Sequence, residues 1–195
     1  SALPAHFVQA FRTVVWYTGN TYPGPLLRYE ATLAAFLNGG GRLFVSGQDI
    51  LDQAAGTTAF VQDYLHIAWD GSETQNDKPT ASVHGVAGNP VTDGIGAVAL
   101  DHSVLGATFE DQVTPIGPAT AAFTDDTGAA DGLTVADGAY RVVFLAFLRG
   151  QALLVVPAGL LQALRRNMSR AWAKPAEIAV FLLIFNDLRR FEQAC

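Results

Sequence analysis

Residues 13–47 carry a pattern of apolar residues that leaves few folds open. Residues 13–17 form a short β-branched and aromatic run, and residues 43–45 form a second run that is apolar throughout. Between them, apolar side chains recur at the spacing of one helix face: Leu26, Tyr29, Leu33, Phe36 and Leu37. Three glycines at 39–41 then end the helix, since glycine adopts the left-handed conformation without a side-chain clash. A helix that links two strands in this way crosses over the sheet, so we expect the two strands to run parallel.

The later part of the chain returns to short strands and then to helices. Apolar runs at residues 121–123, 133–135 and 140–147 indicate strands, and Asp137-Gly138 between the last two predicts a β-hairpin. The spacing of apolar residues beyond residue 158 predicts two terminal helices. We therefore expect an α/β fold with a mainly parallel sheet flanked by helices, a β-hairpin and a helical C-terminus.

Charge divides the chain into two unequal parts. The 195 residues carry a net charge of −6, yet residues 1–148 hold fifteen acids and five bases, and residues 149–195 hold three acids and seven bases. This asymmetry predicts an α/β domain over 1–148 and a basic helical extension over 149–195. An acidic body argues against a nucleic-acid partner.

Cysteine content and hydropathy exclude several further classes of protein. The single cysteine is Cys195, so we expect no internal disulfide, no cysteine nucleophile within the fold and no thiolate metal cluster. The longest apolar runs, such as 178–185, are far shorter than the ~20 residues that span a bilayer, so we expect no membrane partner. The chain begins at Ser1 without a basic stretch followed by an apolar core, so we expect no export signal in it; a processed or excised domain would look the same.

Ser46 is the candidate nucleophile, because it follows directly on the second predicted strand. In a serine hydrolase its base would be one of the later histidines, with Asp49 or Asp101 in support, and His102 is the first choice among His66, His84 and His102. A nucleophile elbow needs small residues two positions before and after the serine, where this chain has Phe44 and Gln48. We therefore favour the interpretation that Ser46 simply ends a strand.

Polar residues and aromatic rings around the same strand ends indicate a ligand crevice. The carboxyl ends of parallel strands form the usual ligand site of open α/β sheets, which makes Gly47 and Gln48 candidates for ligand binding. Trp16 and Tyr17 end the first strand and either contact a small molecule or peptide or cover the sheet. The glycines at 39–41 follow a helix and precede a strand, which is the wrong order for a phosphate-binding loop.

Two groups of acids are candidate cation ligands. Asp49 and Asp52 follow the second strand and either bind a cation or cap the next helix. A second stretch presents oxygen ligands at alternating positions, as calcium loops do, with Asp70 and Asp77 as its carboxylates. It lacks the glycine at its sixth place and the closing glutamate at its twelfth, so a solvated turn is the stronger interpretation. We expect no cofactor other than calcium.

The segments 14–19 and 33–49, which include the sequence Gly-Gly-Gly-Arg-Leu-Phe-Val-Ser-Gly-Gln-Asp, resemble class I glutamine amidotransferase-like, flavodoxin-like domains. The closest resemblance is to the versions attached to exported bacterial subtilisin-like peptidases; it covers roughly residues 12 to 70, with 140–147 as a late strand. It implies an extracellular location and an accessory role beside a hydrolase. The family's nucleophilic cysteine is absent, so the resemblance favours a non-catalytic or degenerate domain; the alternative is a serine hydrolase, an esterase or amidase, that uses Ser46.

The beginning of the chain is short relative to that family. An additional strand and helix usually precede the strand at residues 14–17, and only thirteen residues are present here. A sheet without its first strand exposes unpaired backbone N–H and C=O groups at its edge. We therefore predict a homodimer through this edge, or an edge covered by the C-terminal helices.

Overall fold

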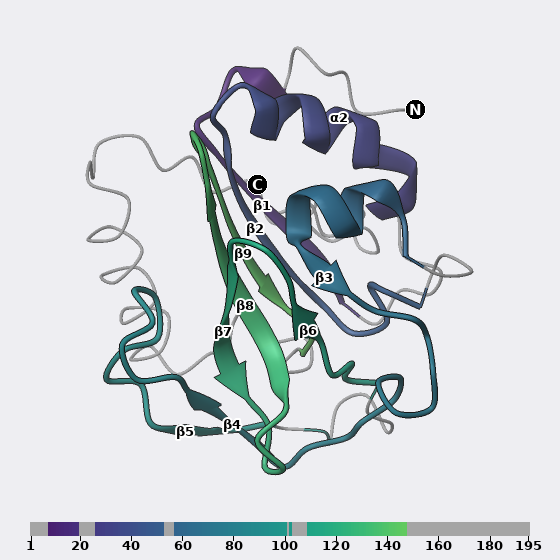
Figure 1. Ribbon diagram of the computed structural model, residues 1–195, viewed down its shortest axis with the longest axis vertical. Helices are drawn as coiled ribbons and strands as arrows, with labels where there is room; N and C mark the ends of the chain where they lie inside the picture. The colour runs from purple at the N-terminus through teal and green to yellow at the C-terminus, as the bar shows by residue number, and fades with distance from the viewer. Residues whose placement is uncertain (1–7, 20–25, 53–56, 101, 103–108, 148–195) are drawn as a thin grey trace, which may run out of the picture.

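The computed structural model describes residues 8–19, 26–52, 57–100, 102 and 109–147 (Figure 1). Its main feature is a seven-stranded sheet in the order β1-β2-β9-β8-β7-β4-β5. The strands of this sheet are β1 (Thr13–Gly19), β2 (Arg42–Gly47), β4 (Ser82–Gly85), β5 (Ala97–Ala99), β7 (Ala119–Thr124), β8 (Ala130–Asp137) and β9 (Tyr140–Leu145). The helices are α2 (Leu26–Asn38) and the short π-helix η1 (Val61–Leu65), and a small second sheet pairs β3 (Ile67–Ala68) with β6 (Thr114–Pro115).

The predicted strand–helix–strand unit is present. β1 and β2 are parallel neighbours, with Val14 opposite Leu43 and Trp16 opposite Val45. The five apolar residues that predicted the helix are all buried in α2. Since a fully buried leucine or phenylalanine contributes about 1.5–3 kcal/mol, this helix face accounts for much of the attachment of α2 to the sheet.

The rest of the sheet differs from the predicted fold class. β9 is parallel to β2, but β8, β7, β4 and β5 follow in antiparallel pairs. The prediction of a mainly parallel, helix-flanked, flavodoxin-like sheet is therefore wrong. The physical reason is the hairpin that the sequence itself predicts: Asp137 pairs with Tyr140 across a tight turn at Gly138, so the chain reverses and β8 runs against β9.

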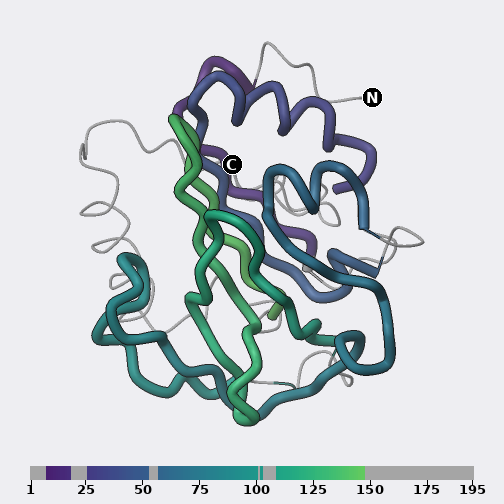
Figure 2. Tube along the Cα trace, in the orientation of Figure 1, coloured from purple at the N-terminus to yellow at the C-terminus, as the bar shows by residue number. Residues whose placement is uncertain are grey.

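The sheet is curled, and its two faces are covered differently. Figures 1 and 2 show β4 and β5 turning across the end of β7, so that the sheet bends like part of a barrel. Both α2 and η1 lie on one face, over a core that includes Trp16, Leu33, Leu43, Leu133 and Phe144. The opposite face carries a second cluster of buried residues from β4, β7 and β9: Val83, Ala122, Phe123, Val143 and Leu145.

The predicted basic helical extension, 149–195, lies outside the described residues. Within the described segments, no helix has the length and apolar character needed to cross a membrane. β1 has one strand neighbour, β2, and forms one end of the described sheet. The predicted homodimer through this edge stays a prediction.

Candidate functional site

Three segments far apart in the sequence meet at the carboxyl end of β2. The segment 109–112 lies between the residues that follow β2 and the loop that follows β3. On one side, the Asp49 backbone N–H donates to the carbonyl of Phe109 at 3.3 Å, and on the other side the Lys78 N–H donates to the carbonyl of Glu110 at 2.6 Å. These hydrogen bonds place acidic side chains from all three segments at one edge of the sheet.

Buried acids are the distinctive feature of this edge. Glu110 and Asp131 are fully buried and Asp111 is 1% exposed. Acidic side chains in proteins are almost never fully buried unless they are paired. Asp131 comes from β8, at the register position next to the Gly132–Leu145 pair with β9. We use the term carboxyl cluster for the following five residues: Asp49, Asp77, Glu110, Asp111 and Asp131.

Hydrogen bonds satisfy only part of the carboxyl cluster. The Gln48 amide donates through Nε2 to Oε1 of Glu110 at 2.9 Å, and Nδ1 of His102 lies 3.6 Å from the same oxygen. In the described part of the chain, both carboxyl oxygens of Asp131 and the Oδ1 oxygen of Asp111 have no hydrogen-bond partner. Buried polar atoms without partners are rare in proteins, and they mark places where a proton, a water molecule or a ligand is expected.

Burial changes the acidity of these groups. Burial, followed by the charge of Asp49, raises the pKa of Asp111 to about 8. Burial, followed by the charge of Asp125, raises the pKa of Asp131 to about 8. Burial, followed by the charge of Asp77, raises the pKa of Asp49 to about 6. At neutral pH the two inner carboxyls therefore retain protons unless a cation replaces them.

Ser46 does not have the surroundings of a nucleophile. Its side chain is buried, and its hydroxyl donates to the backbone carbonyl of Phe147 at 3.1 Å. Its backbone lies within the parallel part of the sheet, opposite Tyr17 on one side and Leu145 on the other. The hydroxyl thus supplies a hydrogen bond to a backbone carbonyl just beyond the end of β9, as expected for a serine that ends a strand.

The candidate bases are occupied elsewhere. Nε2 of His102 lies 2.7 Å from the carbonyl oxygen of Thr80, and Nε2 of His66 lies 2.8 Å from the Tyr140 hydroxyl. His84 forms its contact with Asp126. Among the described residues, no histidine forms a hydrogen bond with Ser46, and the alternative support Asp101 lies outside them. The structure therefore does not assemble the Ser46, His102 and Asp49 combination as a hydrogen-bonded triad.

The predicted ligand-binding residues are mostly interior. Trp16 is 1% exposed and packs against Tyr29, with ring centroids 5.2 Å apart, so it belongs to the core beneath α2. Gln48 is fully buried, where it holds Glu110. A side chain at Gly47 would collide with the Thr18 hydroxyl, so this glycine allows close packing at the end of β2. Tyr17 is only partly buried, and burial raises the pKa of its phenol.

The two predicted metal ligands have separate surroundings. Oδ1 of Asp70 accepts the Ser72 N–H at 2.8 Å, which is the hydrogen bond of a solvated turn. Asp77 instead lies at the rim of the carboxyl cluster, where its backbone N–H donates to the Asp111 carboxyl. In the described residues, no three acidic, histidine or cysteine side chains are already gathered closely enough to hold a metal ion.

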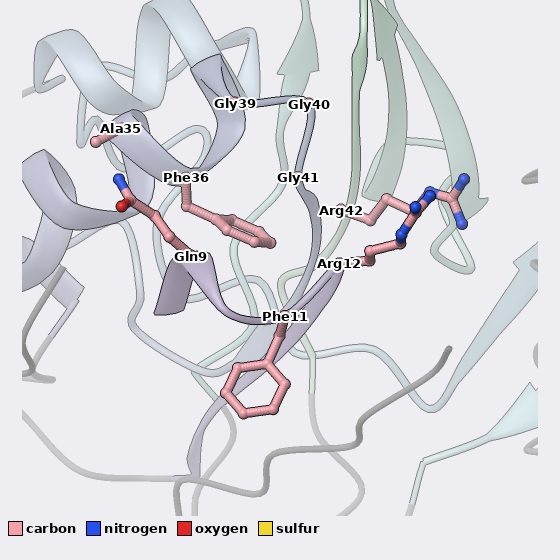
Figure 3. Close-up of a pocket in the computed structure, with 9 residues that line it drawn as sticks. All are labelled: Gln9, Phe11, Arg12, Ala35, Phe36, Gly39, Gly40, Gly41 and Arg42. Carbon is pink, nitrogen blue, oxygen red and sulfur yellow. The ribbon is translucent and has the colours of Figure 1, made fainter. Parts of the chain in front are cut away.

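A pocket of about 560 Å³ lies at the opposite end of the parallel strands (Figure 3). It is lined by the glycine turn at 39–41 and by residues from the starts of β1 and β2, including Arg12 and Arg42. Figure 3 shows the Phe36 ring pointing toward Gly41, whose missing side chain leaves room for it. The glycine turn thus lets the end of α2 pack closely against the start of β2.

The sequence predicts a candidate site at the carboxyl end of β2, but it does not predict the buried acids that the structure places there. Glu110 and Asp111 fall in a loop-rich stretch with no apolar periodicity, so no pattern marked them. Asp131 did carry a signal. It has the same strand parity as Leu133 and Val135, which both face the core, and an acid at an inward position of a strand calls for an explanation.

Comparisons with known proteins yield structural neighbours only. No family model matches the chain, and no curated protein matches it. Among solved structures, the exo-β-1,4-mannosidase Op5Man5 from Opitutaceae bacterium strain TAV5 is 16% identical, with 88% of this chain and 25% of that chain covered and a TM-score of 0.49. A polyextremophilic β-galactosidase from the Antarctic haloarchaeon Halorubrum lacusprofundi is 15% identical, with 85% and 23% covered and a TM-score of 0.49.

The third neighbour has the better structural agreement. The mmIFT52 N-terminal domain is 11% identical, with 92% of this chain and 84% of that chain covered and a TM-score of 0.53. At this identity the likeness concerns the fold alone. The chain spans about a quarter of the length of the two glycosidases. The mixed sheet, which is antiparallel from β9 onward, overturns the predicted membership of the glutamine amidotransferase-like family.

Proposed function

We propose that this domain is a non-catalytic accessory domain, which binds a ligand or partner and carries out no hydrolysis of its own. The observation that supports it is the hydrogen bond from the Ser46 hydroxyl to the Phe147 carbonyl, 3.1 Å long and buried. A serine becomes nucleophilic when an adjacent base accepts its proton. Here the acceptor is a backbone carbonyl, which cannot take a proton.

The histidines add independent support for this proposal. Each of His66, His84 and His102 has a side-chain or backbone partner other than Ser46. Both ring nitrogens of His102 have partners: Nδ1 lies 3.6 Å from Oε1 of Glu110, and Nε2 lies 2.7 Å from the Thr80 carbonyl oxygen. A serine mechanism would need Ser46 and a histidine to rearrange together in the interior of the sheet.

The decisive experiment is an esterase assay on the full chain with p-nitrophenyl acetate. We expect wild type and Ser46→Ala to hydrolyse the ester at the same rate as a protein-free blank containing the same buffer. Ser72→Ala is the matched control, since its hydroxyl lies on an exposed turn, where it contacts Thr74 and the Asp70 carboxyl. A rate above the blank that is lost in Ser46→Ala, kept in Ser72→Ala and accompanied by unchanged melting would establish the serine hydrolase instead.

The remaining functional expectations stay predictions. These are the partner hydrolase, the extracellular location and a small molecule or peptide as ligand. The homodimer is the simplest to test, because size-exclusion chromatography of the full chain with light scattering reports its mass directly. A monomer at all concentrations would remove the dimer through the β1 edge.

A further inference from the structure

Asp111 occupies a position that a buried acid rarely holds. It lies in the segment 109–112, between the residues after β2 and the loop after β3, and is 1% exposed. Its carboxyl accepts one hydrogen bond from the Asp77 backbone N–H. Its Oδ1 is buried and has no hydrogen-bond partner in the described part of the chain.

The charges around Asp111 are negative. Besides burial, the charges of Asp49, Asp77 and Asp52 raise the pKa of Asp111, so these carboxylates lie near it. Lys78 is the only lysine in residues 1–148; its charge acts on Asp77, where it partly offsets the rise in pKa that burial causes, and its ammonium donates to the carbonyl oxygen of Glu73. A buried carboxylate strongly destabilises the fold unless a proton or a cation neutralises it.

The donor atoms available here are oxygens. In addition to the carboxylate oxygens, the side-chain oxygen Oδ1 of Asn76 is buried and has no hydrogen-bond partner among the described residues. Calcium binds six to eight oxygens from carboxylates, amides, carbonyls and water in flexible geometry, whereas magnesium requires a near-ideal octahedron and loses water reluctantly. An irregular set of oxygens drawn from separate loops suits calcium better.

We propose that the end of β2 is a calcium site, with Asp111 as its inner ligand and Asp49 and Asp77 as ligands at its rim. This inference is independent of the proposed accessory function. Asp49 and Asp77 come from loops on either side of the segment that carries Asp111. Because the described side chains are not already gathered around one point, the ion draws the two rim carboxylates onto Asp111. Calcium binding therefore fastens the three segments together.

The test uses the full chain, freed of metal with EDTA and dialysed. Calcium chloride is titrated by calorimetry, and melting is followed with calcium and with EDTA at neutral pH. A ligand that binds only the folded state raises the melting temperature, by about 5–10 °C at a hundred times its Kd for a domain of this size. Magnesium at the same concentration should produce a smaller rise.

Variants then locate the site. Asp111→Asn should abolish the calcium-dependent rise, and Asp49→Asn should weaken binding by at least about tenfold. Asp70→Asn is the matched control: it removes the same charge from a neighbouring turn, and its amide oxygen can still accept the Ser72 N–H. It should bind calcium like wild type.

Three results would overturn the proposal. One is a wild-type chain whose melting is the same in calcium and in EDTA. Another is Asp111→Asn that folds and binds calcium as tightly as wild type. The third is a loss of binding in Asp70→Asn, which would place the ion in the solvated turn. If Asp111→Asn does not fold, unchanged affinity in Asp49→Asn refutes the site and a tenfold loss supports it.

Discussion

Replacing Asp131 with asparagine should stabilise the protein at neutral pH and lose this stabilising effect in acid. Asp131 is fully buried, neither of its carboxyl oxygens has a hydrogen-bond partner in the described residues, and burial raises its pKa from 3.8 to about 8. Asparagine has nearly the same shape but no titrating group. The comparison therefore isolates the cost of the buried charge.

The sign and size of the effect follow from proton linkage. A carboxyl whose pKa rises on folding costs nothing below about pH 4, where it is protonated in both states. The cost grows as pH rises from about 4 to about 8, because the folded state must retain a proton that the unfolded chain releases. At pH 7 this cost is up to about 4 kcal/mol. After allowance for the amide that asparagine buries, we expect a gain of about 2–4 kcal/mol.

The assay is urea unfolding followed by tryptophan fluorescence at pH 4.5, 6 and 7.5, in EDTA so that no divalent cation neutralises the cluster. Asp126→Asn is the control with the opposite sign. Hydrogen bonds from Ser82, His84 and Thr80 hold the pKa of Asp126 well below its usual range, so its charge stabilises the fold above the unfolded pKa and this variant should lose stability at pH 7.5. If the difference between Asp131→Asn and wild type were the same at pH 4.5 and pH 7.5, the linkage argument would be refuted.

Two further predictions concern packing and hydrogen bonding near the same edge. Gly47→Ala should destabilise the fold by about 1–3 kcal/mol, since its new methyl group would collide with the Thr18 hydroxyl and approach Ile50 within 2.9 Å. We expect a lower urea midpoint with an unchanged m-value. A variant as stable as wild type would show that the end of β2 packs loosely. Tyr140→Phe should lower the free energy of unfolding by about 1 kcal/mol, because it removes the hydroxyl that lies 2.8 Å from Nε2 of His66. Thermal melting measures this loss, and an unchanged melting temperature would mean that the contact contributes nothing to stability.

The parallel half of the fold was predictable from local patterns. The 3.6-residue periodicity of α2 and the glycines after it predict a helix that crosses over the sheet between β1 and β2. A helical crossover between adjacent strands makes them parallel, as β1 and β2 are. The β8–β9 hairpin was also predictable, because Asp137-Gly138 stands between two β-favouring runs. These signals are short-range, so one sequence suffices to interpret them.

Two strands of the antiparallel half, β4 and β5, were missed because they are short and lie among turns. β4 and β5 have four and three residues, and their surroundings are rich in glycine and proline, so neither shows a clear period. The order in which strands join a sheet is a long-range property. The hairpin should have warned against a mainly parallel sheet, since every strand added beyond β8 by another tight turn continues the antiparallel series.

The location of the carboxyl cluster follows from this mixed topology. β2 and β9 are parallel, so their carboxyl ends meet at one edge, while the antiparallel β8 brings the start of its own strand, with Asp131, to the same edge. A wholly parallel sheet would have placed the start of β8 at the opposite end, where β2 and β9 begin. The acid at the start of β8 can therefore join those after β2 only because the sheet is mixed. The substitution Asp131→Asn and the binding of calcium both reduce the negative charge of the carboxyl cluster at high pH. Calcium should therefore stabilise Asp131→Asn less than it stabilises wild type, and the substitution should stabilise the fold less when calcium is present.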